Sequence, residues 1–575
     1  MTAGDGSLAR IVRRTVHAPL AGNLDPVLRR VYAARGIGSA DELNLDLREL
    51  LPVSSLDGIE GAVDLLMDAY ARRRRLLVIG DFDADGATST ALVVRGLRRL
   101  GFSEVGYLVP DRFRFGYGLT PEIVALAAER APDLIITVDN GMSSDAGVAA
   151  ARARGIDVLI TDHHLPGATL PDANAICNPN LTGAVFKSKA LAGVGVAFYV
   201  LAALTRRLQD ERGGATLPAP ADLLDLVALG TVADVVAFDR NNRILVAQGL
   251  KRIRAGRCVP GIQALLAEGG RRHERAVASD LGFAAGPRLN AAGRLLDMSI
   301  GIECLLADDC AHARVLAAQL GALNQERRAI EQRMNEDAAA IVCRMQLDAS
   351  DLALGLCLYD ANWHHGVVGL VAARAKERLH RPVIAFAPAQ DPWLRGSARS
   401  VAGVHMRDTL DAVAKCRPGL LEKFGGHALA AGLTLHRERL EEFRALFAAE
   451  VARRMSREDA EGIVASDGAL APEEMTLATA QTLRDGGPWG QGFPEPVFDG
   501  RFAVLEARTV AERHLKLRVR SGRDTPVHDA IAFNFARQGR AALPRSADVV
   551  RLAYRLDVNE YRGVERLQLV IEQLC

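Results

Sequence analysis

The spacing of apolar residues along the chain indicates where strands and helices lie. From Leu76 onward, short apolar runs alternate with amphipathic stretches in which apolar residues recur every three or four positions. The apolar runs predict buried strands, and the stretches between them, such as 88–100 and 121–130, predict helices. Strands separated in this way indicate a parallel sheet with crossover helices. The expected strands are 76–79, 105–109, 134–138 and 158–161.

The second half of the chain contains a long helical pattern, a second α/β pattern and a purely β pattern. Residues 308–346 keep helical spacing without a proline, which predicts a helix about 55 Å long. Strand signals resume at 352–358 and 383–386, and after Gly500 only strand-like alternation remains. Five short strands with little helix favour a small barrel of the OB type. These strands are expected at 502–510, 514–520, 529–535, 549–558 and 563–572.

The predicted fold class is therefore α/β, with two α/β lobes joined by a long helix and followed by an OB-type β-barrel. A length of 575 residues fits about four domains at ~150 residues each. The expected boundaries are 1–55 for an N-terminal segment, 56–300 for the first lobe, 301–350 for the connecting helix, 351–457 for the second lobe and 458–575 for the barrel region.

Composition narrows the class of protein. A hydrophobic fraction of 49% and a charged fraction of 25% exclude a largely disordered or fibrous chain. The 71 basic and 70 acidic residues nearly cancel, which excludes a uniformly basic nucleic-acid coat. The longest uncharged apolar run, 190–204, is shorter than the ~20 residues of a membrane helix, so we expect a buried helix there and a loop at 207–221. We expect a soluble, cytoplasmic protein with reduced thiols and no membrane association.

Acidic residues follow three of the predicted strands. Because the carboxyl ends of parallel strands meet at one edge of a sheet, we expect these side chains to lie together, where carboxylates repel unless cations neutralise them. Carboxylate and imidazole ligands without thiolate favour Mn²⁺ or Mg²⁺, with Zn²⁺ also possible, and two bridged ions would build a phosphoryl-transfer site. The residues are Asp81, Asp83, Asp85, Asp139, Asp162, His163 and His164.

Two other interpretations of these acids fit less well. Asp81 and the acids after it match the first half of a calcium-binding EF-hand loop, but its twelfth position is Leu92, where a glutamate is required. A phosphatase with a nucleophilic aspartate would normally need a lysine near the phosphate, and it would leave the two histidines unexplained. For Asp81 and Asp162, helix capping or a turn is the structural alternative.

The motifs around these residues resemble the successive motifs of the DHH phosphoesterase family. The strand-end DxDxD, the turn at Asp139, the Asp162-His163-His164 triplet and Asp234 all match that pattern. Later motifs are similar to those of the RecJ-type single-stranded-DNA exonucleases within that family, and the resemblance runs from about residue 20 to the end. These later motifs are 286–294, 365–369, 396–400 and 424–427.

The resemblance implies a two-ion centre, with Mn²⁺ as the cofactor and Mg²⁺ as a possible substitute. Asp83 would hold one ion with Asp81 nearby, and Asp139 would bridge both ions. His164 would face the scissile phosphate and Asp162 would orient the histidine pair. The ligands of the other ion would be Asp85, His163 and Asp234.

Glycine-flanked loops and arginines supply the candidate substrate-binding residues. Phe115 departs from the family, where an acid is expected, and leaves the role of the 113–118 loop open. One face of a predicted barrel strand is basic, through His514 and every second residue to Arg520, which suits single-stranded DNA. Trp489 is expected to be a packing residue. The substrate-binding candidates are Arg112, Arg288, Asn290, Arg294, Ser397, Arg399, Gly425, Gly426 and His427.

The implied activity is 5′-to-3′ hydrolysis of single-stranded DNA to 5′-mononucleotides, in recombinational and mismatch repair. The expected partners are a single strand with a 5′ end, the single-strand-binding protein and a repair helicase. The protein itself is expected to be a monomer. One alternative is a pyrophosphatase or small-nucleotide phosphodiesterase, which would not need the barrel. A second is an inactive DNA-binding replication scaffold, against which the complete ligand set argues.

Overall fold

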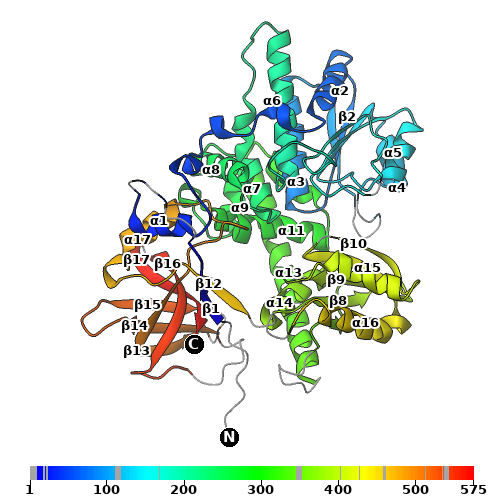
Figure 1. The fold of residues 1–575 in the computed structure, drawn as a ribbon. Coiled ribbons are helices and arrows are strands. Elements are labelled where there is room, and N and C mark those ends of the chain that lie inside the picture. The colour runs from blue at the N-terminus through cyan, green and yellow to red at the C-terminus, as the bar shows by residue number, and fades with distance from the viewer. Residues whose placement is uncertain are drawn as a thin grey trace.

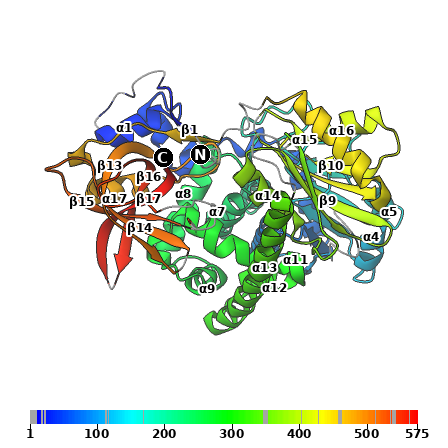
Figure 2. The ribbon, with the colours of Figure 1, turned by 90° about the horizontal axis from the view of Figure 1, so that it is seen from below.

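The computed structural model confirms the predicted architecture of two α/β lobes, a connecting helix and a closed barrel (Figure 1). In Figure 2 the barrel and the second lobe lie on opposite sides of the molecule, with the connecting helix α13 (Cys310–Arg344) between them. The structure describes residues 10–16, 20, 22, 24–110, 115, 118–167, 169–344, 353–401, 403–426, 428–456, 462–511, 513–533, 535, 543–561 and 563–575.

The first lobe is built on a parallel five-stranded sheet in the order β3-β2-β4-β5-β6. Apolar residues point to both faces of each strand. Val78 packs toward helices α3 (Ala84–Leu100) and α6 (Gly193–Glu211), while Leu77 packs toward α4 (Pro121–Ala128) and α5 (Asp145–Arg152). Since β3 and β4 flank β2, the strand order reverses beside β2, where open sheets bind ligands. The strands are β2 Leu76–Gly80, β3 Val105–Leu108, β4 Leu134–Val138, β5 Asp157–Thr161 and β6 Ala175–Cys177.

Helices cover this sheet and extend the lobe toward the barrel. The predicted buried helix at 190–204 is confirmed, but it continues through 211, so the loop predicted at 207–221 begins later than expected. Its charged last turn lacks a helix breaker before the glycine pair at 213–214. The helices are α2 Ile59–Ala71, α3 Ala84–Leu100, α4 Pro121–Ala128, α5 Asp145–Arg152, α6 Gly193–Glu211, α7 Leu224–Ala233, α8 Arg240–Arg254, α9 Pro260–Glu268, α10 Ala278–Asp280, α11 Gly286–Leu295 and α12 Ser299–Leu306.

The long helix α13, Cys310–Arg344, confirms the helix predicted over 308–346 and leads into the second lobe. That lobe has a mixed sheet in the order β10-β11-β9-β8-β7, in which only β7 and β8 are parallel. Met334 and Ala338 of α13 pack into one of its cores. Its elements are β7 Leu356–Tyr359, α14 Val368–Leu379, β8 Val383–Pro388, β9 Trp393–Arg399, α15 Met406–Cys416, β10 Leu421–Gly426, β11 Ala430–His436 and α16 Leu440–Ala452.

The C-terminal strands close into a barrel in the order β13-β14-β15-β17-β16. The barrel core and the core of the first lobe form one continuous apolar cluster, whereas the second lobe has cores of its own. Trp489 is buried against Phe493 at this junction, which confirms it as a packing residue. The elements are α17 Leu477–Asp485, β13 Phe498–Val510, β14 His514–Arg520, β15 Val527–Ala532, β16 Val549–Tyr561 and β17 Val564–Leu574.

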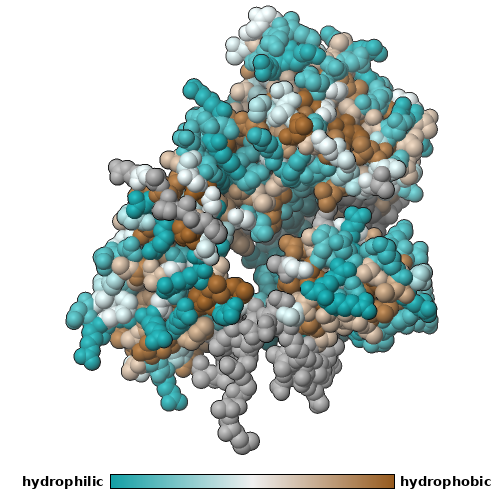
Figure 3. Space-filling model, viewed as in Figure 1, coloured by the Kyte–Doolittle hydropathy of each residue, from teal (hydrophilic) through white to brown (hydrophobic). Residues whose placement is uncertain are grey.

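The N-terminal segment packs against the barrel region, far from it in sequence. Strand β1, Arg10–Arg13, pairs in parallel with β12, Ile463–Ser466, and helix α1, Pro26–Ala33, places Tyr32 against Trp489. The space-filling view shows an opening below the first lobe, between the barrel and the second lobe (Figure 3). Among the described residues, none of the helices has the length and apolar character needed to cross a membrane.

Candidate metal centre

The sheet register brings the acidic strand ends together. Val138 of β4 pairs with Gly80 of β2 on one side and with Thr161 of β5 on the other. The residues that follow these three, Asp81, Asp139 and Asp162, therefore leave the same edge of the sheet side by side. All three are buried, although they are carboxylates. The prediction that the acids gather at one edge is thus met by the sheet geometry.

Side chains at this edge form three overlapping groups that could each hold a metal ion. Within each group, the candidate ligand atoms all lie within 4.8 Å of one another. Asp139 belongs to two groups and so does His163, whose Nε2 lies 3.1 Å from Asp139 Oδ1 and 3.6 Å from Asp234 Oδ2. The groups are Asp81, Asp83 and Asp139; Asp85, His163 and Asp234; and Asp139, His163 and His164.

Two helix starts hold the acids of the DxDxD segment. Asp83 caps α3, and its Oδ1 accepts hydrogen bonds from the amides of Asp85 and Gly86 at 2.9 and 3.0 Å. The buried Asp85 carboxylate accepts from the amides of Gly193 and Val194, at the start of α6, at 2.7 and 3.0 Å. Both carboxylates are therefore fixed before any ligand binds.

Backbone conformation contributes to the same arrangement. Asp139 has a left-handed φ of 60°, and Val235, directly after Asp234, has a φ of 61°. L-residues rarely adopt this conformation, and it costs of order 1–3 kcal/mol when the side chain is β-branched or bulky. The surrounding structure therefore imposes these conformations: the one at Asp139 sets where its own side chain projects, and the one at Val235 sets how the chain turns away after Asp234.

The electrostatics of the cluster favour a bound cation. Burial and then repulsion from Asp83 raise the pKa of Asp85 to about 7. Burial and repulsion from neighbouring carboxylates, Asp85 first among them, also raise the pKa values of Asp139 and Asp234 well above the ordinary range. Among the residues that the structure describes, buried Asp234 Oδ2 accepts no hydrogen bond, and His163 Nε2 lies 3.6 Å away. The oxygen-rich donor set therefore fits divalent ions such as Mn²⁺ or Mg²⁺.

His164 is held by Asp162. Asp162 Oδ1 lies 2.7 Å from His164 Nδ1 and also accepts from the amides of His163 and His164, while Oδ2 accepts from Met142 N at 3.0 Å. Burial lowers the pKa of His164, but the hydrogen bond and charge of Asp162 outweigh it and raise the pKa to about 9. The imidazole is thus oriented through Nδ1 and stabilised as a cation.

Two asparagines that the sequence reasoning missed position the histidines. Asn178 Nδ2 donates to His164 O at 2.9 Å, and Asn180 Nδ2 donates to His163 O at 2.7 Å. Both follow β6, a three-residue strand whose apolar run is too short to stand out. The Asn-Pro-Asn sequence at 178–180 is the signal that could have marked a constrained turn there.

The arginine and asparagine candidates on α11 have protein partners. Arg288 donates to the carbonyls of Ala284 and Glu268. Asn290 Oδ1 accepts from Ala84 N at 2.8 Å, which ties α11 to the start of α3 beside Asp83. Arg294 Nη1 lies 3.4 Å from Gly366 O and so links the first lobe to the second.

The second-lobe candidates lie on two strands of its sheet. On β9, Arg399 Nη1 donates to Ser397 Oγ at 3.1 Å and to Ala398 O at 2.8 Å, and burial lowers its pKa. A Cβ at Gly369, in the first turn of α14, would lie 3.0 Å from both side chains. Gly425 and Gly426 lie on β10. Arg112, His427 and most of the 113–118 loop lie outside the described residues.

Three models of known protein families match successive parts of the chain, in the first lobe, the second lobe and the barrel region. The model of the N-terminal domain of the DHH family matches residues 75–231, that of the DHHA1 domain matches 349–453, and that of the RecJ OB domain matches 466–573.

Curated relatives align over nearly the whole length. The chain is 56% identical to the single-stranded-DNA-specific exonuclease RecJ of Dickeya dadantii, over 98% of each protein. It is 53% identical to the RecJ of Escherichia coli, over 97% of each. The crystal structure of Thermus thermophilus RecJ in complex with Mn²⁺ superposes with a TM-score of 0.79 at 33% identity, covering 96% of this chain and 76% of that one. The chain therefore belongs to the RecJ family of DHH proteins.

Proposed function

We propose that this chain is a metal-dependent exonuclease that hydrolyses single-stranded DNA from its 5′ end and releases 5′-mononucleotides. The observation that carries the proposal is the set of three overlapping ligand groups that share Asp139 and His163 at the edge of the sheet. Relatives that align over nearly the full chain are single-stranded-DNA-specific exonucleases, and a related RecJ structure contains Mn²⁺ and another Mg²⁺. Both supports point to phosphodiester hydrolysis at this cluster.

The residues of the cluster would have different roles in binding the metal ions and the phosphate. One ion would be held by Asp83 and Asp81. The other ion would be held by Asp85, His163 and Asp234, and Asp139 would contact both ions. When bound, two divalent ions stabilise the negative charge of a phosphate under attack. Because Asp162 occupies His164 Nδ1, His164 would direct Nε2 toward a phosphate oxygen and offer it a proton. Asp162 acts on substrate only through the histidine that it orients.

The second lobe and the barrel would hold the strand. Ser397 and Arg399 offer a hydroxyl and a buried guanidinium near the start of α14, and Gly425 and Gly426 allow close backbone approach. Arg112, Arg288, Asn290, Arg294 and His427 remain candidates for phosphate contacts. The alternating cations of β14 suit a single-stranded backbone. Through the family, we infer roles in recombinational and mismatch repair as a monomer, with the single-strand-binding protein and a repair helicase as partners.

The test is release of nucleotides from 5′- and 3′-labelled single strands, duplex DNA and pyrophosphate in Mn²⁺, for wild type, Asp139→Ala and Asp145→Ala. Asp145 is an exposed carboxylate six residues away and serves as the matched control. Loss of residues that only orient metal ligands typically costs 10- to 100-fold, so Asp139→Ala should lose more than about 100-fold. Asp145→Ala should degrade the 5′-labelled single strand at the wild-type rate.

Three outcomes would contradict the proposal. Equal degradation by wild type and Asp139→Ala would mean that the cluster is not the reaction centre. Rapid pyrophosphate hydrolysis with DNA untouched would make the chain a small-molecule phosphoesterase, and inactivity on every substrate would make it a binding protein.

A further inference from the structure

A π-helical turn, η6 Leu281–Ala285, leads directly into α11. Gly286 N donates to Leu281 O, five residues back along the chain, whereas a regular helix bonds residues four apart. Pro287 has no N–H to donate to Phe283 O, so the regular ladder is interrupted at that carbonyl. The proline therefore accounts for a widened turn around Phe283. Single π turns of this kind occur frequently at functional sites.

This turn and α11 lie along the metal centre. A Cβ at Gly286 would lie 3.1 Å from the Cβ of Ala233, the residue before the candidate ligand Asp234. One turn further on, Asn290 Oδ1 accepts a hydrogen bond at 2.8 Å from the first amide of α3, directly after Asp83. The helix therefore passes the end of α7 first and the start of α3 next, so it runs beside ligands of both expected ions.

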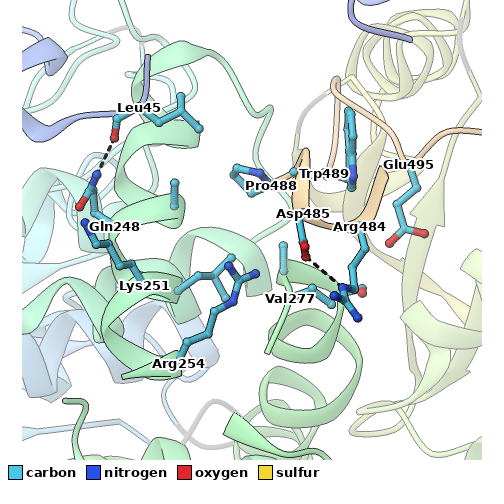
Figure 4. A pocket seen from close by; sticks show the side chains of 15 residues that line it. Leu45, Gln248, Lys251, Arg254, Val277, Arg484, Asp485, Pro488, Trp489 and Glu495 are labelled. Carbon is cyan, nitrogen blue, oxygen red and sulfur yellow. Dashed lines mark hydrogen bonds and ion pairs between the residues drawn. The ribbon is translucent and has the colours of Figure 1, made fainter. Parts of the chain in front are cut away.

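The two ends of this helical segment face the barrel region and the second lobe. Arg275, three residues before α10, pairs with Glu560 of barrel strand β16 at 2.7 Å. Val277 then lines a cavity of about 350 Å³ between α8 and the end of α17 (Figure 4). At the other end, Arg294 Nη1 lies 3.4 Å from Gly366 O of the second lobe. A strand that follows the helix would thus run from the barrel side, past the metal centre, to the second lobe.

Phe283 is exposed in the middle of the π-helical turn. Its side chain is 77% exposed, whereas Leu281 and Ala284 on either side are buried. Phe283 shares one helical face with Asn290 and Arg294, because positions i, i+7 and i+11 fall on the same side of a helix. Single exposed apolar residues are common on protein surfaces. This ring, however, lies in line with two candidate substrate contacts and next to a candidate metal ligand.

The place of the ring identifies what would cover it. Phe283 precedes Asn290 by seven residues, which is about 10 Å along the helix axis toward the barrel side. If the second lobe holds the 5′ end, the strand on the 3′ side of the scissile phosphate leaves the metal centre in this direction. Aromatic rings stack on any base, because every base has a π face. We propose that Phe283 stacks on a nucleobase on the 3′ side of the scissile phosphate. The inference rests on the proposed function, which sets the polarity of the strand.

Steady-state hydrolysis of short oligo(dT) in Mn²⁺ tests the proposal with Phe283→Ala, Phe283→Tyr and Leu170→Ala. Stacking of one base on an aromatic ring is typically worth about 5- to 100-fold in affinity, so Phe283→Ala should raise KM at least about fivefold and change kcat less than about twofold. Phe283→Tyr keeps the ring and should stay within about twofold of wild type. Leu170→Ala is the matched control, because Leu170 is an exposed apolar residue next to Thr169, which contacts Asp145 of α5.

Substrates with a single abasic site at successive positions separate stacking from a structural effect. The measurement is release of the first 5′ nucleotide. Wild type should lose at least about fivefold in kcat/KM at one position on the 3′ side of the first scissile bond. Phe283→Ala should show no further loss there, because ring and base are two halves of one interaction. If every abasic site has the same effect in wild type and Phe283→Ala, or if Phe283→Tyr is as slow as Phe283→Ala, the proposal is overturned.

Circular dichroism shows whether each variant is folded. If Phe283→Ala is not, Phe283→Leu replaces it, because leucine keeps an apolar side chain without a ring. A sensitive abasic position on the 5′ side of the scissile bond would also overturn the proposal, since Phe283 lies on the barrel side of the metal centre.

Binding measured without turnover keeps this inference distinct from the proposed function. Ca²⁺ replaces Mn²⁺, since it also takes carboxylate oxygens as ligands, and the strand carries 2-aminopurine, whose fluorescence falls when the base stacks. We expect quenching with wild type and its loss with Phe283→Ala. A chain that quenches through Phe283 but degrades no DNA in Mn²⁺ would contradict the proposed function and leave the stacking site standing. A chain that degrades DNA from the 5′ end, with equal quenching by wild type and Phe283→Ala, would contradict only the stacking site.

Discussion

Single side chains at this site act through more than one hydrogen bond each, and Asp162 is the clearest case. Its two oxygens accept from the amides of Met142, His163 and His164 and meet the His164 imidazole. Burial would raise the pKa of Asp162, but the hydrogen bond and charges of the two histidines lower it overall. The Asp162 carboxylate is therefore ionised in the folded protein. It fixes both the backbone of the His163–His164 segment and the His164 ring.

Asp162→Asn should slow the exonuclease reaction by about 10- to 100-fold at saturating Mn²⁺. An amide offers one acceptor oxygen and one donor nitrogen, so its NH₂ group must face either the Met142 amide or the donors at Oδ1. The ring of His164 then loses its fixed orientation. The measurement is the initial rate of 5′ nucleotide release.

Asp172→Asn is the matched control, because Asp172 is an exposed carboxylate that pairs with Arg152 on the surface. It should keep the wild-type rate. An Asp162→Asn enzyme that is as fast as wild type would show that the histidine pair needs no orienting carboxylate.

At the scale of elements, the start of α6 closes the metal centre from one side. The amides of Gly193 and Val194 hold Asp85, and Gly193 also lies against Asp139. A Cβ at Gly193 would lie 2.8 Å from both Cβ and Oδ1 of Asp139, closer than real Cβ atoms approach such neighbours. The glycine is therefore required by the close packing of the helix on the ligand residue.

Gly193→Ala should lower the apparent affinity for Mn²⁺ and the exonuclease rate at least about tenfold, because Asp139 or α6 must shift. The measurement is the rate of single-strand degradation across a Mn²⁺ titration. Gly61→Ala is the control: Gly61 lies within α2, and an added Cβ would meet only Ala175 Cβ at 3.7 Å. The control should keep the wild-type titration, and a Gly193→Ala titration that overlays it would exclude the packing argument.

Strands whose own residues form a continuous apolar run were predictable from the sequence, and strands without such a run were not. Strands β2, β4 and β5 are apolar on both faces, so their runs stand out, and the acids at their ends mark the shared edge. Strand β10 is largely exposed and glycine-ended, and β9 alternates small and charged residues, so neither gives a strong apolar signal. The Asn-Pro-Asn sequence marks a turn at 178–180, but the contacts of Asn178 and Asn180 with the histidine backbone, and of the Gly193 amide with Asp85, join separate elements and leave no local pattern.

At the scale of the whole molecule, the N-terminal segment joins the barrel region to the catalytic lobe. Arg35 of this segment pairs with Asp467 at 2.9 Å in a fully buried bridge, and its guanidinium lies over the Trp489 ring. Arg13 bonds to Asp499 in the first barrel strand. These contacts join residues more than 400 positions apart, so the sequence pattern alone did not reveal them. They hold the barrel at a fixed place beside the shared core.

The Asp499 cluster predicts a pH dependence for this joint. Burial raises the pKa of Asp499, but hydrogen bonds from Arg13, Ser466 and Arg551 outweigh it and lower the pKa to about 2. In the unfolded chain the value is about 3.9. A pKa that is lower in the folded state means that the ionised carboxylate stabilises the fold. That stability is complete above about pH 4 and disappears as the pH falls toward 2.

Asp499→Asn removes this titration. The variant should unfold at a lower temperature than wild type at pH 7, because Arg13 and Arg551 lose their shared anion, and the difference should shrink as the pH falls from 4 toward 2. Thermal unfolding followed by circular dichroism at several pH values measures it, with Asp485→Asn, an exposed carboxylate outside this cluster, as the control. A difference between wild type and Asp499→Asn that stays constant from pH 7 to 2 would mean that the carboxylate contributes by shape alone, and that its charge does not help to join the N-terminal segment to the barrel.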